Sequence, residues 1–162
     1  MAKSTRQYVF EGMELLPSAL IPFVEKRLES SIKGHWQLEV VQRVQGLRPN
    51  STGDVGWDQQ GLLKTMMAFW KDAFAMVLGH PERSYVSELL DVRNKLSHNE
   101  TFTYDDAERA LDSMRRLMEA ISAGDAAEQL SRMRDTILRT KFTELQRNEE
   151  RRKTQRLEIS VE

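Results

Sequence analysis

The chain has 162 residues, of which 40% are hydrophobic and 30% are charged, so it is long enough for one globular domain with a single core. Its formal net charge of -1 excludes a protein that coats nucleic acid over its whole surface, because such binding needs clustered Lys and Arg. It has no cysteine, which excludes a disulfide framework and a thiolate nucleophile.

Neither a metal nor a cofactor is expected, because His35, His80 and His98 are far apart and form no His-x-x-x-His pair. The amino-terminal segment lacks the apolar stretch of a secretory signal, and no run approaches the ~18 apolar residues that span a bilayer. We therefore expect a cytoplasmic protein that does not contact a membrane.

Apolar spacing predicts helices along the first third of the chain. From Arg6 to Ser30, apolar residues recur at three- and four-residue intervals, although Pro17 and Pro22 interrupt the pattern, so this segment is either two short helices or one kinked helix. The segment 36–45 fits a short helix or a strand, and we favour a helix. An irregular loop rich in turn residues is expected at 46–56. The apolar face of the first segment comprises Phe10, Met13, Leu16, Leu20, Phe23, Val24 and Leu28.

Three further helices are predicted in the middle of the chain. Segment 57–78 is apolar on more than one side, as expected of a central helix. Gly79 and Pro81 are typical of a helix end and a helix start, so the next helix runs from about 82 to 96. Thr103, followed by two aspartates, starts another helix that runs to about Ala123.

A last helix begins near Asp125 and loses its apolar spacing after Leu145. The predicted fold is all-α, a bundle of about five to six helices with an extended charged C-terminal helix or tail. We expect a helical domain at 1–146, and a charged linker or the start of a following domain at 147–162. Residues 157–162 alternate apolar and polar, which predicts a strand.

The most distinctive chemistry lies in the segment Arg93, Asn94, Lys95, Leu96, Ser97, His98. In a continuous helix, ~100° per residue would place Arg93 and His98 about 140° apart. The two side chains can converge only if the helix ends between them. Ser97 and Asn99 favour such an exit, because their side chains compete for backbone hydrogen bonds.

These residue types suit phosphodiester chemistry. Arginine is always charged and matches phosphate oxygens, while histidine can give or take a proton near neutral pH. On RNA the 2′-hydroxyl is an internal nucleophile, so a base, an acid and a charge stabiliser suffice. The alternative is structural: Arg93 pairs with Glu88, Asp91 or Glu100, and His98 is an exposed residue after a helix. The basic residues after 131 are likewise either a solvated helix face or an RNA track.

The segment 83–121 resembles the HEPN superfamily. The likeness rests on Asp-Val-Arg-Asn-Lys-Leu-Ser-His followed, after a short link, by Asp-Asp-Ala-Glu-Arg-Ala-Leu-Asp, and it extends over about 6–138. It is closest to the branch shared by a eukaryotic nuclear mRNA-surveillance endonuclease and the N-termini of large prokaryotic defence-associated proteins. The resemblance implies a bundle of four or more helices, often a homodimer with two Arg-x-x-x-x-His elements facing each other. In active members these elements form a metal-independent endoribonuclease that leaves cyclic phosphate ends.

By this resemblance Arg93 holds the scissile phosphate, His98 transfers a proton, and Asn94 orients them or the substrate. The chain departs from toxins that pair with a nucleotidyltransferase antitoxin, because Glu100 stands where they carry Tyr. Two hypotheses follow. The first is an endoribonuclease, a homodimer acting on RNA in prokaryotic defence or RNA processing. The alternative is a non-catalytic dimerisation or nucleic-acid-binding module at the N-terminus of a larger defence-associated protein with further domains.

Overall fold

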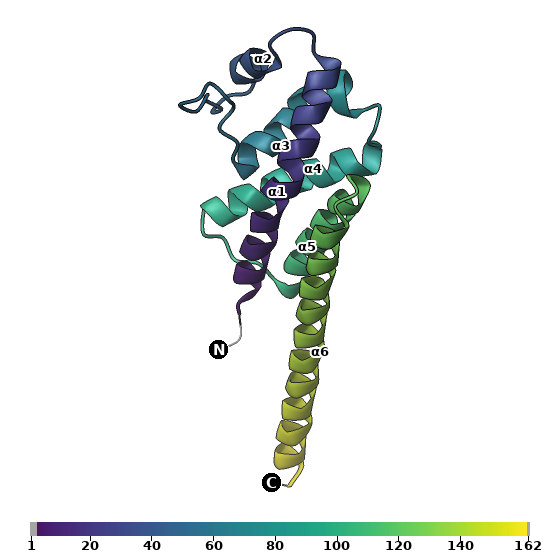
Figure 1. Cartoon of the computed structure of the whole chain (residues 1–162). Helices are drawn as coiled ribbons and strands as arrows, with labels where there is room; N and C mark the ends of the chain where they lie inside the picture. Colours follow the sequence, from purple (N-terminus) through teal and green to yellow (C-terminus); the bar gives the residue numbers. More distant parts are fainter. Residues whose placement is uncertain (1–2, 162) are drawn as a thin grey trace.

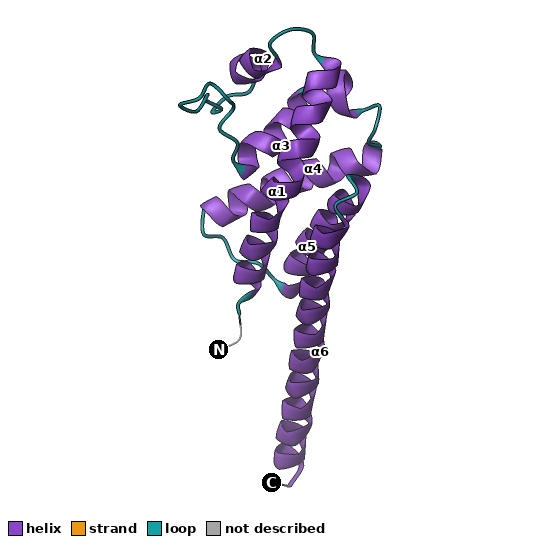
Figure 2. Ribbon diagram, viewed as in Figure 1, coloured by secondary structure: helices purple, strands orange, loops and turns teal. Residues whose placement is uncertain are grey.

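The computed structural model describes residues 3–161, in which helices joined by loops are the regular elements and no strand occurs (Figure 1; Figure 2). The predicted all-α bundle with a long C-terminal helix is confirmed. A loop occupies 46–56 as expected, and the segment that fitted either a helix or a strand is the helix α2. The elements are α1 (Thr5–Ser31), α2 (Trp36–Arg43), α3 (Gln59–Ala68), the π-helical turn η1 (Trp70–Phe74), α4 (His80–Ser97), α5 (Tyr104–Ala120) and α6 (Gly124–Val161).

The first helix, α1, is continuous in spite of its two prolines, so the two-helix alternative is wrong. Each proline removes a backbone hydrogen bond, but one face of α1 is buried from Val9 to Leu28, and this packing holds the helix together. Pro22 is exposed and Pro17 is half-buried, so neither displaces a core side chain. One predicted member of the apolar face lies outside the core: the side chain of Phe10 is 47% exposed.

The predicted central helix is interrupted, which corrects the expectation of one helix over 57–78. The α3 helix ends at Ala68, and a wider π turn follows, in which the Ala75 N–H donates to the Trp70 carbonyl over 2.7 Å. The irregular turn is held by tertiary contacts: the Arg27 Nε donates to the Ala73 carbonyl over 2.9 Å. No local sequence signal marks this break, because the groups that hold it come from α1 and the core.

Helix α1 packs against α3, α4, α5 and α6, and thus lies at the centre of the bundle (Figure 1). It lies close to α5 at Gly12, where an added Cβ would lie 2.8 Å from Leu111 Cδ2 and 2.9 Å from Met114 Sδ. α5 begins where predicted, with a reciprocal capping box between Thr103 and Asp106. The position of α1 is therefore fixed on several sides, and α1 forms one wall of the cleft described below.

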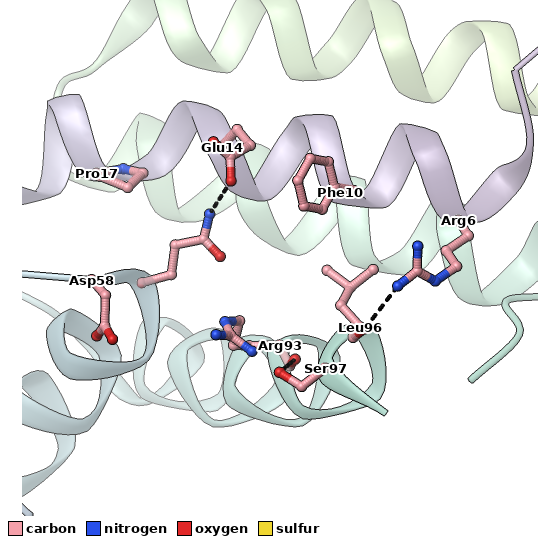
Figure 3. Close-up of a pocket in the computed structure, with 9 residues that line it drawn as sticks. Arg6, Phe10, Glu14, Pro17, Asp58, Arg93, Leu96 and Ser97 are labelled. Carbon is pink, nitrogen blue, oxygen red and sulfur yellow. Dashed lines mark hydrogen bonds between the residues drawn. The ribbon is translucent and has the colours of Figure 1, made fainter. Parts of the chain in front are cut away.

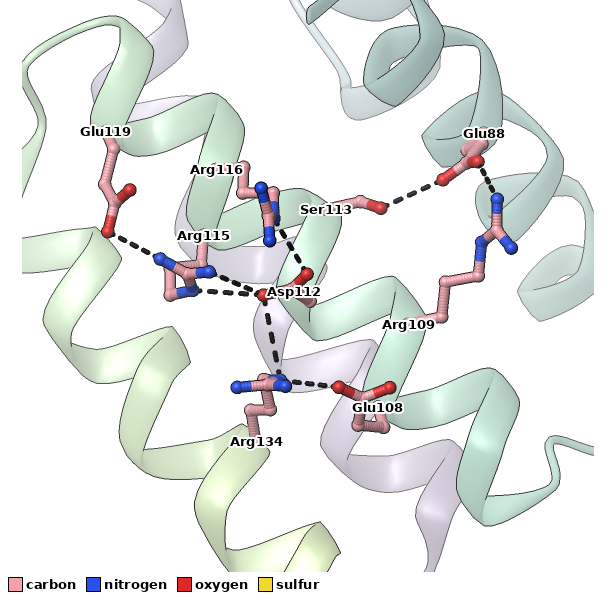
Figure 4. A network of polar contacts seen from close by, with 9 residues as sticks. All are labelled: Glu88, Glu108, Arg109, Asp112, Ser113, Arg115, Arg116, Glu119 and Arg134. Carbon is pink, nitrogen blue, oxygen red and sulfur yellow. Dashed lines mark hydrogen bonds and ion pairs between the residues drawn. The ribbon is translucent and has the colours of Figure 1, made fainter. Parts of the chain in front are cut away.

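A polar network joins α6 to α5 (Figure 4). Arg134 of α6 donates to Glu108 over 2.6 Å and lies 3.7 Å from the carboxylate of Asp112. Burial alone would raise the pKa of Asp112. Hydrogen bonds from Arg115 and Arg116 outweigh this effect together, so the pKa lies below its ordinary value. Asp112 is therefore the charged centre that holds arginines from both helices.

The last helix continues far beyond the bundle (Figure 1), and residues 147–161 belong to it. The predicted strand at 157–162 is wrong for 157–161, and residue 162 lies outside the described residues. Arg, Glu, Lys and Gln, which dominate this stretch, are good helix formers and extend a helix that has already begun. The domain boundary after residue 146 stays a prediction. Within residues 3–161, no helix combines the length and apolar character needed to cross a bilayer.

We predict that Gly12→Val lowers the free energy of unfolding by about 1–3 kcal/mol, because the new side chain overpacks the contact of α1 with Leu111 and Met114. Urea denaturation followed by far-UV circular dichroism measures the change. The control is Gly124→Val, where an added Cβ meets nothing within 4 Å and stability should stay nearly constant. Equal effects of the two substitutions would show that α1 does not pack as closely as described.

Candidate functional site

The site begins with the way in which α4 ends. The helix stops at Ser97, and Asn99 adopts a left-handed conformation with φ of 54°. The Glu100 N–H donates to the Lys95 carbonyl over 3.0 Å, and the Asn99 N–H to the Leu96 carbonyl over 3.4 Å. This pair of bonds is the Schellman arrangement, in which Asn is the usual substitute for Gly. The helix ends after Ser97, as expected, but the His98 N–H still donates to the Asn94 carbonyl over 3.1 Å, so the turn itself follows His98. Convergence of Arg93 and His98 stays a prediction.

Arg6 of α1 holds this helix end from the opposite wall. Its Nη2 donates to the Leu96 carbonyl over 2.8 Å (Figure 3) and to the Asn99 Oδ1 over 3.0 Å. A guanidinium beside the last carbonyls of a helix also interacts favourably with the negative end of the helix dipole. Arg6 therefore stabilises both the carbonyl end of α4 and the residue that turns the chain.

A cleft of about 510 Å³ lies between α1, the start of α3 and the end of α4. Figure 3 shows Arg6, Phe10, Glu14 and Pro17 along α1, facing Arg93 across the cleft. Because residues three and four apart share one face of a helix, the α1 side chains form a single stripe. The lining residues are Arg6, Phe10, Glu14, Pro17, Asp58, Gln59, Arg93, Leu96 and Ser97.

Arg93 is half-buried and lines this cleft. None of the ion pairs among residues 3–161 includes Arg93, so the ion-pair alternative for it is wrong within this part of the chain. Glu88, one of the three expected partners, instead pairs with Arg109 and accepts from the Ser113 hydroxyl over 2.9 Å. The hydrogen bond from Arg109 holds the pKa of Glu88 below its ordinary value. The guanidinium of Arg93 therefore faces the cleft without a carboxylate partner from residues 3–161.

The other two predicted site residues lie close by, but they do not line the cleft. Asn94 is exposed, and its Oδ1 accepts a long 3.4 Å hydrogen bond from Gln60 Nε2. His98 is the C-cap residue of α4, with an exposed side chain, and it directly follows the cleft-lining Ser97. Within one chain, Arg93 faces the cleft and His98 faces solvent beside it.

Two carboxylates also line the cleft, and both have structural partners. Glu14 accepts a hydrogen bond from Gln59 Nε2 over 3.1 Å, and Asp58 caps α3 by accepting from the Gly61 N–H over 2.6 Å. Neither carboxylate forms an ion pair with Arg93 among residues 3–161. Residues 3–161 contain no group of three or more His, Asp or Glu side chains arranged to hold a metal ion.

Sequence reasoning missed Arg6 and Phe10 as members of the site. Arg6 precedes the carbonyl that it binds by 90 positions, and nothing near it in the sequence marks its role. Phe10 fits the apolar period of α1 and was predicted to be core, but it lies at the edge of that face and opens into the cleft. Both assignments depend on how α1 crosses α4, which local patterns do not encode.

An all-helical bundle with an Arg-x-x-x-x-His element at the end of one helix defines the class of this protein. The family model for the Swt1-like HEPN domain matches residues 11–122, which is more than half of the chain. The chain belongs to this family, which confirms the predicted superfamily and agrees with the predicted branch. No curated protein and no solved structure is detectably similar to it.

We predict that Asn99→Val destabilises the protein by about 1–2 kcal/mol and moves the NMR signals of the His98 imidazole, because a β-branched residue is strained at a positive φ. Asn99→Gly relieves the strain and should cost less, although it removes the acceptor of Arg6.

Ser122, at the end of α5, has φ of 63° and provides the matched control. Ser122→Val should destabilise to a similar extent but leave the His98 signals in place. An Asn99→Val protein as stable as the parent would contradict the described helix end.

Proposed function

We propose that this domain is a metal-independent endoribonuclease that acts as a homodimer on RNA, in prokaryotic defence or RNA processing. One observation carries the proposal: Arg93 lines a cleft without a carboxylate partner in residues 3–161, at a helix end where His98 is exposed. Membership in the Swt1-like HEPN family and the fit of these residues to phosphodiester chemistry support it. The biological setting rests on the resemblance alone.

In the proposed reaction, the 2′-oxygen of RNA attacks the adjacent phosphorus, and the bond from phosphorus to the 5′-oxygen breaks. A neutral His98 imidazole takes the 2′-hydroxyl proton, and an imidazolium gives a proton to the leaving 5′-oxygen. A homodimer supplies two copies of His98, one for each role. Arg93 stabilises the charge that develops on the phosphate, and Asn94 orients the substrate. The products are a 2′,3′-cyclic phosphate and a 5′-hydroxyl.

The second candidate is a non-catalytic dimerisation or nucleic-acid-binding module at the N-terminus of a larger defence-associated protein. The middle of α6 favours it, because Leu138, Phe142 and Leu145 follow one helix face and are 37%, 63% and 55% exposed. Such a row of apolar side chains is typical of a helix that binds a partner. This candidate requires binding but no cleavage.

The test is cleavage of labelled RNA by the purified protein in EDTA. We expect the parent chain to cleave, His98→Ala to lose about 10²–10⁴-fold in rate, and Arg93→Ala to lose about 10²–10³-fold, as for other proton-transfer groups and charge stabilisers. Cleavage by His98→Ala at the parent rate would rule out the assignment. RNA binding without any cleavage by the parent would favour the second candidate.

His80 gives a matched control for this experiment. It is an exposed histidine at the opposite end of α4, so His80→Ala removes the same side chain from the same helix without touching the cleft. Its cleavage rate should equal that of the parent. A loss as large as that of His98→Ala would mean that the assay reports the stability of α4 instead of the site.

A further inference from the structure

Phe10 is an aromatic side chain left open to solvent inside the cleft. It is 47% exposed, whereas Val9 and Met13, its neighbours on α1, are fully buried. Figure 3 shows Phe10 on the cleft wall between Arg6 and Glu14. An exposed aromatic ring beside cationic side chains is the arrangement by which proteins stack single-stranded bases.

The cleft also has a positively charged part. Arg6 and Arg93 both line it, and neither takes part in an ion pair among residues 3–161. The Nε of Arg6 is buried and has no hydrogen-bond acceptor in this part of the chain. Two guanidiniums that have no carboxylate partner within the described residues attract an anion, and their planar donors match phosphate oxygens.

The acidic groups of the cleft restrict where a phosphate can lie. Asp58 and Pro17 lie at one end and Arg6 at the other, with Arg93 between them (Figure 3). The carboxylate of Asp58 repels a phosphate from its end of the cleft. Glu14 lies across from Arg93, where its carboxylate accepts from Gln59 Nε2, so a phosphate is favoured on the Arg6 side of Arg93 (Figure 3). A base on Phe10 and a phosphate on the arginines are thus neighbours, as they are within one nucleotide.

We propose that the cleft binds one nucleotide of single-stranded RNA, with its base stacked on Phe10 and its phosphate held by Arg93 and attracted by Arg6. This subsite rests on the proposed function for its choice of RNA, but not for cleavage. It selects unpaired RNA, because a base within a duplex has no open face to offer the ring. Every base can stack on an aromatic ring, so the subsite distinguishes single strands from duplexes but does not select a particular base sequence.

The test measures binding without cleavage. Short RNAs with 2-aminopurine at one position are titrated into the full chain carrying His98→Ala, and stacking is read as quenching of the base fluorescence. We expect Phe10→Leu, added to His98→Ala, to abolish quenching at the responsive position and to weaken affinity about 10- to 100-fold. Phe10→Tyr, which keeps an aromatic ring, should retain both.

Leu38→Ala is the control, because Leu38 is also an exposed large apolar residue, at 61%, but lies on α2, outside the cleft. It should leave quenching and affinity unchanged. Sedimentation of each variant distinguishes a base from a second copy as the occupant of Phe10: loss of the dimer in Phe10→Leu would overturn the proposal. Unchanged quenching in Phe10→Leu, or no quenching by the His98→Ala chain at any position, would also overturn it.

These outcomes separate the subsite from the proposed function. If the unsubstituted chain cleaves RNA in EDTA, while adding Phe10→Leu to His98→Ala leaves RNA binding unchanged, the subsite fails and the endoribonuclease proposal stands. If no cleavage occurs but quenching depends on Phe10, the subsite stands and the endoribonuclease proposal fails.

Discussion

The left-handed turn at Asn99 is the constraint on which the site depends. In a continuous helix, Arg93 and His98 would point to different faces. The Schellman turn ends α4 directly after His98, whose N–H still donates to the Asn94 carbonyl, and leaves His98 exposed beside the cleft. Arg6 stabilises this end from α1 with bonds to the Leu96 carbonyl and the Asn99 side chain. The geometry of the motif is therefore a tertiary property, since it requires α1 to lie beside the end of α4.

Helix α1 connects the core to the cleft. One face packs against α5 and α6, closely enough at Gly12 to leave no space for a larger side chain, and another face carries Arg6 and Phe10 into the cleft. Because the buried face fixes the rotation of the helix, it also fixes where the exposed stripe points. On the other side of the bundle, the contacts of Arg134 with Glu108 and Asp112 fix α6 against α5.

Local sequence signals predicted the helix ends that are formed by residues close together in the chain. Thr103 and Asp106 begin α5 with a capping box, and Asn99 ends α4, as their residue types indicate. The π turn at Trp70 and the exposure of Phe10 could not be read from apolar spacing, because they depend on neighbours distant in sequence. The position of Arg93 in a cleft, without a carboxylate partner in residues 3–161, likewise emerged only with the fold.

The proposed reaction stands or falls with the 2′-hydroxyl as nucleophile. The most direct measurement compares two RNAs that differ only in a single 2′-deoxy substitution at the cleaved position, each incubated with the parent chain in EDTA. The account predicts that the all-ribose RNA is cut to a 2′,3′-cyclic phosphate and that the substituted linkage stays intact. Cleavage of the 2′-deoxy linkage, or products with a 3′-hydroxyl and a 5′-phosphate, would contradict the proposed roles of Arg93 and His98.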